Sequence, residues 1–163
     1  MGQRIIGLVG KRTALNETIK IVGAQYLAPL QQDLFILPLG HSALDALATY
    51  EKPSHTGFTY LGPELEQALR NASAKDGFLY IESDFFGGIG SQAAALFRDA
   101  RLIWKEARAL GEEPALFSQL LGCEAKWPVN EGLRAMGVQR RSDMDEFSAI
   151  GLHEYRAPDM EDE

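Results

Sequence analysis

The run Phe78–Phe86 constrains the fold more than any other part of the sequence. Its residues, Phe-Leu-Tyr-Ile-Glu-Ser-Asp-Phe-Phe, include the aromatic and aliphatic types that favour strands, and the run Gly-Gly-Ile-Gly at 87–90 ends it. The alanines of the next segment, 91–110, favour a helix by propensity. However, Asp99-Ala100 divides this segment into two apolar runs, as a two-residue hairpin connection does. We therefore predict a meander of three antiparallel strands over 78–110.

Shorter elements precede this meander. A strand over Ile5–Val9 is followed by a helix over Thr13–Val22, in which apolar residues recur at helical spacing. Two further strands, Tyr26–Leu30 and Leu34–Leu39, are joined by a tight turn at 31–33. We expect this hairpin to pair with the first strand.

The remaining elements are expected to be short. The sequence predicts helices over 41–50, 63–75, 114–121, 128–136 and 143–150, a loop over 51–57 and a short strand over 58–61. Together these elements indicate an α+β fold, with a mostly antiparallel sheet, a central meander and short helices packed on the sheet. We expect one domain over residues 1–156 and a frayed acidic tail over 157–163.

The charge of the chain is unevenly distributed. The net charge is −7, and 45% of the residues are hydrophobic. Residues 1–81 contain seven basic and seven acidic side chains, whereas residues 82–163 contain nine basic and sixteen acidic ones. Such a surface repels phosphate backbones and attracts basic proteins, so we expect no nucleic-acid binding and a basic protein partner. The alternative, which we favour for the charge taken by itself, is that the negative charge only keeps the protein soluble.

The sequence indicates a cytoplasmic protein. Cys123 is the one cysteine, so no intrachain disulfide can form, and its apolar neighbours suggest a buried, inert thiol. The apolar stretch at 5–10 is too short for a signal-peptide core or a membrane span. We expect no membrane association.

A glycine motif follows the strongest strand. Residues 88–93, Gly-Ile-Gly-Ser-Gln-Ala, match the G-x-G-x-x-A pattern of dinucleotide-binding turns. The motif begins past the midpoint of the chain, and no acidic residue ends a clear second strand about twenty residues later, as ribose binding requires. We therefore favour a role for these glycines in bending the chain at a bulge.

Two acidic residues of the strand form the other candidate site. Glu82 and Asp84 lie two residues apart, so their side chains share one strand face, where they could bind a divalent ion or act as acid and base. The alternative, which we favour, is that they form the solvent-facing half of an edge strand. The candidate binding residues are Glu82, Asp84, Gly87, Gly88, Gly90 and Gln92. The three histidines are scattered, and we predict no catalytic residue, no metal and no cofactor.

Two segments resemble a group of small uncharacterised bacterial cytosolic proteins. The first is 80–94, Tyr-Ile-Glu-Ser-Asp-Phe-Phe-Gly-Gly-Ile-Gly-Ser-Gln-Ala-Ala, and the second is 145–152, Asp-Glu-Phe-Ser-Ala-Ile-Gly-Leu. The resemblance implies a bacterial origin and a single domain, with Gln92 and the glycines as structural landmarks. It implies no activity.

The function that we expect from the sequence is protein binding without catalysis. Small size, clustered acidity and aromatic residues are typical of an immunity-type inhibitor that neutralises a partner toxin. The alternative is a small enzyme or a nucleotide- or metal-binding protein centred on Glu82, Asp84 and the Gly87–Gly90 loop. A homo-oligomer that uses an exposed edge of the meander is a third hypothesis.

Overall fold

A computed structural model describes residues 3–22, 27–40, 55–86, 89–110, 127–141 and 144–155. The elements in chain order are β1 (Gln3–Gly10), α1 (Arg12–Val22), β2 (Ala28–Pro29), β3 (Phe35–Pro38), α3 (Pro63–Ala72), β4 (Phe78–Phe86), β5 (Ile89–Arg98), β6 (Arg101–Leu110), α5 (Pro128–Ala135) and α6 (Glu146–Ala149). The helices predicted over 41–50 and 114–121, the start of the loop predicted over 51–57 and the acidic tail at 157–163 lie outside the described residues.

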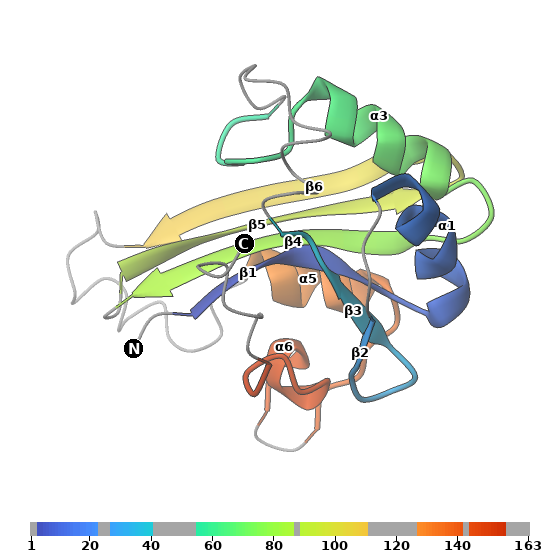
Figure 1. Cartoon of the computed structure of the whole chain (residues 1–163). Helices are drawn as coiled ribbons and strands as arrows, with labels where there is room; N and C mark the ends of the chain where they lie inside the picture. The colour runs from blue at the N-terminus through green and yellow to red at the C-terminus, as the bar shows by residue number, and fades with distance from the viewer. Residues whose placement is uncertain are drawn as a thin grey trace.

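The six strands form one open antiparallel sheet, which confirms the predicted α+β fold. Their order is β2-β3-β1-β4-β5-β6 (Figure 1). The β2–β3 hairpin pairs with β1 as expected. The meander β4-β5-β6 extends from the middle of the sheet, where β4 lies beside β1, to the edge that β6 forms.

The segment after the glycines is a pair of strands and not a helix. Asp99 and Ala100 connect β5 to β6, and both have positive φ angles, of 54° and 59°. Two left-handed residues in succession match the right-handed twist of a hairpin. The alanines of β5 are buried on both faces, at Ala93 and Ala95 on one and at Ala94 on the other. Tertiary burial therefore overrides their helical propensity.

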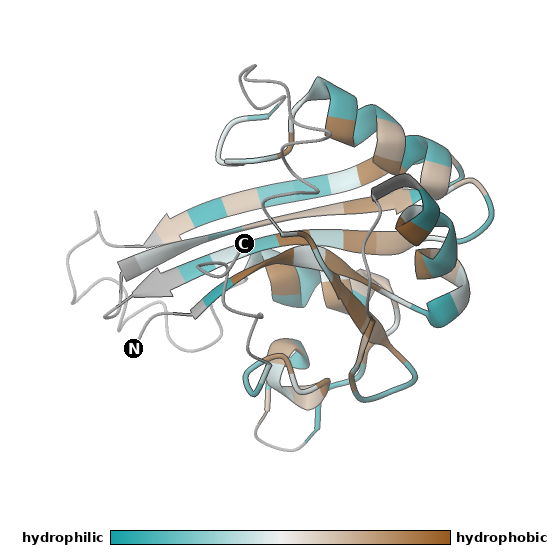
Figure 2. Ribbon diagram, in the orientation of Figure 1, coloured by the Kyte–Doolittle hydropathy of each residue, from teal (hydrophilic) through white to brown (hydrophobic). Residues whose placement is uncertain are grey.

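Helices cover both faces of the sheet. Helices α1 and α3 lie on one side and α5 and α6 on the other (Figure 1). We call the side of α1 and α3 the upper face and the side of α5 and α6 the lower face. The apolar residues of β1, β3, β4 and β5 form two buried clusters, one against each pair of helices, whereas β6 contains both hydrophilic and hydrophobic residues (Figure 2). In the part of the chain that the structure describes, no helix is both long and apolar enough to cross a membrane.

Two of the shorter predictions differ from the structure. Residues 58–61 do not form a strand, because the main-chain N–H groups of Thr59 and Tyr60 bond to a side chain and not to a neighbouring strand. The helix predicted over 143–150 is reduced to α6, because Asp145 caps its start by accepting a hydrogen bond from the main-chain N–H of Ser148.

Candidate functional site

Glu82 lies at the centre of the sheet and not on an exposed edge. Its strand, β4, is paired with β1 on one side and with β5 on the other, where Glu82 is aligned with Ile6 and Ala93. Only 7% of Glu82 is exposed to solvent. The prediction that Glu82 belongs to the solvent-facing half of an edge strand is therefore wrong. A carboxylate that is buried in this way needs hydrogen-bond partners.

Three groups donate hydrogen bonds to the Glu82 carboxylate, and two of them belong to the loop at residues 55–61. The main-chain N–H of Thr59 donates to Oε2 of Glu82 at 2.7 Å, and the N–H of Tyr60 donates to Oε1 at 2.8 Å. The hydroxyl of the fully buried Tyr80 also donates to Oε1, at 2.7 Å. Hydrogen bonds to a charged acceptor are stronger than those between neutral groups. Glu82 therefore attaches the loop at residues 55–61 to the middle of the sheet.

Burial changes the ionisation of both partners in the Tyr80–Glu82 pair. Burial raises the pKa of Glu82, although the hydrogen bonds from Thr59 and Tyr80 and the charge of Arg4 oppose this effect. Burial also raises the pKa of Tyr80, and the charge of Glu82 adds to this effect. The phenol therefore stays a donor, and the buried carboxyl group retains protons at higher pH than an ordinary glutamate.

The start of the same loop is attached to two other elements. The Nε2 atom of His55 donates to the carboxylate of Glu66 on α3, and its Nδ1 atom accepts from the ammonium group of Lys105 on β6. Gly57 lies so close to β6 that a Cβ atom there would come within 2.4 Å of the Cβ of Ala107. Its φ angle of +88° also favours glycine. The sequence gives no sign of this arrangement, because residues eleven and fifty positions apart in the chain share no local pattern.

Phe58 contacts both Tyr80, which binds Glu82, and His55, which binds Glu66 and Lys105. Its ring stacks on that of Tyr80 at a centroid distance of 6.3 Å and meets the edge of His55 at 6.0 Å. The loop is thus fixed by apolar contact as well as by hydrogen bonds.

A small hollow lies beside Glu82 on the upper face. Its volume is about 50 Å³, and its lining includes Arg4, Tyr60, Glu82, Asp84 and Ser91. Asp84 is exposed to solvent and forms no ion pair with another described residue. The guanidinium of Arg4 lies over the Tyr60 ring, 5.4 Å from its centroid. Ligand pockets for drug-sized molecules are roughly 300–1,000 Å³, so this hollow has room for about one side chain.

The structure brings Glu82 and Asp84 together but separates them from Gln92. Gln92 is aligned with Ser83, so its side chain points to the lower face. There its Oε1 atom accepts a hydrogen bond of 3.3 Å from the main-chain N–H of Val129, in the first turn of α5. Gln92 therefore caps the first turn of α5.

The glycine motif is followed by a strand. Gly87 and Gly88 lie outside the described residues, and Gly90 belongs to β5. Phe86 is aligned with Ile89 in the antiparallel pair of β4 and β5, so the chain reverses direction between them. The pyrophosphate site of a dinucleotide fold uses the N-terminus of a helix directly after the glycines. Here β5 takes the place of that helix.

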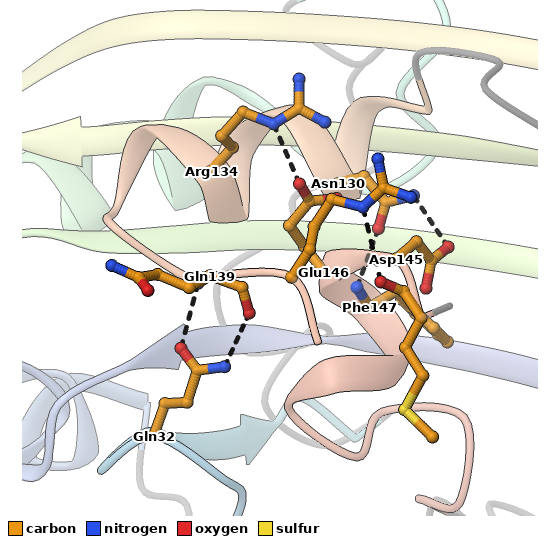
Figure 3. A network of polar contacts seen from close by, with 9 residues as sticks. Gln32, Asn130, Arg134, Gln139, Asp145, Glu146 and Phe147 are labelled. Carbon is orange, nitrogen blue, oxygen red and sulfur yellow. Dashed lines mark hydrogen bonds and ion pairs between the residues drawn. The ribbon is translucent and has the colours of Figure 1, made fainter. Parts of the chain in front are cut away.

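A second polar network joins the C-terminal elements on the lower face (Figure 3). Asn130 of α5 donates to Asp145 at 3.0 Å and accepts from the main-chain N–H of Phe147 at 2.8 Å. Arg134 forms an ion pair of 2.9 Å with the buried Glu146. Partial burial acts to raise the pKa of Asp145, but hydrogen bonds from Ser148 and Asn130 outweigh it and lower the pKa.

A separate pair of hydrogen bonds reaches the hairpin of β2 and β3. Gln32, in the turn of that hairpin, forms two hydrogen bonds with the main chain of Gln139, of 2.9 and 3.1 Å (Figure 3). These two hydrogen bonds hold the turn of the hairpin against the segment that follows α5.

Comparisons with protein-family models, with curated proteins and with solved structures found no match to this chain. Among the described residues, no three His, Cys, Asp or Glu side chains come together in a group that could hold a metal ion.

Proposed function

We propose that this protein is a cytoplasmic, non-catalytic protein-binding module of the immunity type, which neutralises a partner toxin. The observation that supports this proposal is the hydrogen bonding of the Glu82 carboxylate. Both of its carboxylate oxygens already accept hydrogen bonds from the protein itself. A general acid or base needs an oxygen within hydrogen-bond reach of its substrate. Glu82 instead gives a fixed shape to the loop at residues 55–61 and to the surface around it.

The hollow beside Glu82 suits a single side chain of a partner protein. Its volume of about 50 Å³ is far below that of a coenzyme site, and the exposed Asp84 lies at its rim. A lysine or arginine side chain of the partner would place its charge beside Asp84. Binding interfaces commonly obtain much of their energy from a few such anchors in fixed pockets.

The distribution of charge supports a basic partner. Two segments, 111–126 and 156–163, together contain seven acidic and two basic residues, and so account for most of the net charge of −7. A negative net charge speeds the approach of a basic protein, and this effect weakens as salt is added.

The test is co-expression of this protein with the basic proteins that neighbouring genes encode, each assayed for toxicity. We expect rescue of growth and co-purification of the two chains. Asp84→Lys should weaken the binding at least about tenfold, because it places a positive charge at the rim of the hollow. Glu64→Lys is the matched control, since Glu64 is also exposed but lies on α3 outside the hollow. Failure of the wild-type protein to rescue growth, or equal effects of the two variants, would contradict the proposal.

The alternative function stays a prediction. Glu82 and Asp84 do line one hollow, so binding of a nucleotide or a divalent ion there can be measured by thermal denaturation. A ligand at ten times its dissociation constant adds about 1.4 kcal/mol to the stability, which such an assay detects. A panel of nucleotides and metal ions that leaves the melting temperature unchanged would remove this alternative.

A further inference from the structure

We propose that two copies of this chain associate through the outer edge of β6, so that their sheets join into one continuous antiparallel sheet. The two edges of the sheet differ in a way that points to β6. The opposite edge is β2, which has two residues, one of them Pro29. Short edge strands and prolines are common devices that prevent further pairing.

β6 has neither of those devices. It is ten residues long, contains no proline, and has no strand on its outer side among the described residues. Its irregularity lies near the turn, at the register shift between Leu96 and Phe97 of β5, so residues 104–110 pair regularly with β5. Helix α3 packs on β6 from the upper face of the sheet and helix α5 from the lower face. Ile103 is 47% exposed, so the strand also presents apolar surface to solvent.

The lysine of β6 does not protect the edge in the usual way. Lysines on edge strands commonly discourage pairing because they project a charge towards an approaching strand. Here the ammonium group of Lys105 is bound to Nδ1 of His55, and His55 is bound to Glu66 of α3. Lys105 is thus directed over the upper face of its own subunit.

The charges along β6 select one register for pairing with a second copy. When the two-fold axis passes through Ala107, Glu106 lies opposite Arg108 of the second copy, and the same pair occurs again across the axis. An axis through residue 105, 106 or 108 would instead place like charges opposite each other. The two pairs lie on the lower face, where Trp127 holds Arg108 in place, with the guanidinium 5.2 Å from the ring centroid. Charge complementarity therefore favours a second copy as the occupant of this edge.

The first experiment measures the mass of the full chain by sedimentation and light scattering at micromolar to millimolar concentrations. We expect a concentration-dependent rise from the 18.0 kDa of one chain to twice that mass. Glu106→Arg and Arg108→Glu should each weaken the dimer at least about tenfold, because each converts both cross-strand pairs into pairs of like charge. Circular dichroism confirms that each variant is folded. A wild-type protein that remains monomeric throughout would overturn the proposal.

Mixing the two variants provides the decisive control. One Glu106→Arg chain and one Arg108→Glu chain restore two opposite-charge pairs in the register through Ala107, so the mixture should form a heterodimer although neither variant dimerises alone. Glu64→Arg, an equal charge change on α3, should leave the wild-type dimer unaffected. A dimer that neither variant weakens, or a mixture that fails to associate, would show that the contact is elsewhere. This test is independent of toxin binding and can fail while the proposed function holds.

Discussion

Replacement of Glu82 by alanine is the most direct test of how the loop at residues 55–61 is held. The change removes the acceptor of three hydrogen bonds, from Thr59, Tyr60 and Tyr80. The Tyr80 hydroxyl is fully buried, and loss of its partner should cost about 1–3 kcal/mol. The N–H groups of Thr59 and Tyr60 lie beside the hollow, where water can replace the carboxylate, so each should cost about 0.5–1 kcal/mol.

The expected net loss is about 2–4 kcal/mol, because removal of a buried charge offsets part of the cost. That loss is a large share of the roughly 5–15 kcal/mol that stabilise a typical domain. Urea unfolding near neutral pH, followed by tryptophan fluorescence, measures it. The matched control is Asp84→Ala, two residues along the same strand face, where the exposed side chain has no described partner and the change should stay within about 0.5 kcal/mol.

A double-mutant cycle separates the contribution of the Tyr80–Glu82 hydrogen bond from the contributions of the Thr59 and Tyr60 hydrogen bonds. Tyr80→Phe alone should cost about 1–2 kcal/mol and should cost much less when Glu82 is already alanine. Our reasoning would be refuted if Glu82→Ala destabilised the protein no more than Asp84→Ala. Additive effects of the two substitutions would show that the bond contributes nothing.

Three further changes test other features of the structure. Ala100→Gly should raise the free energy of unfolding by about 0.5–1 kcal/mol in urea, because Ala100 has a φ angle of 59°; an unchanged value would show no strain there. Gly132→Ala should cost about 1–3 kcal/mol, because a Cβ atom would come within 2.5 Å of the Leu79 side chain, whereas Gly62→Ala, with open space around it, is the control. Glu82→Gln should alter the pH dependence of the free energy of unfolding. Because the pKa of Glu82 is raised in the folded protein, its contribution to stability is largest below the pKa of the unfolded chain, near 4.5. This contribution is lost as the pH rises through the pKa of the folded protein. The stability difference between wild type and Glu82→Gln should therefore shift in favour of wild type as the pH falls from 7 to about 4.5, and parallel curves would contradict this.

Local sequence was sufficient to predict the elements whose conformation is decided by a short pattern of neighbouring residues. The strand Phe78–Phe86 has the bounds that its composition predicts, and Pro63 begins α3 as expected. The break at Asp99-Ala100 correctly divides two strands, since a two-residue turn is a property of the adjoining residues alone. In each case the information lies within about ten neighbouring residues.

The candidate site required the tertiary structure. The pattern of β4 correctly placed Glu82 and Asp84 on one face but gave no sign that Glu82 is buried. Burial follows from the pairing of β4 with β1 and from the loop at residues 55–61, which lies more than twenty residues earlier in the chain.

The sequence by itself determined the class of fold, the strands of the meander, and the excess of acid in the second half of the chain. Only the tertiary structure decided that Glu82 holds a loop, that Gln92 caps α5 on the opposite face, and that β6 is the long edge of the sheet. The physical reason is that periodicity and turn chemistry are set by neighbours in the chain. The partner of a buried carboxylate, in contrast, is whichever donor the folded chain brings to it.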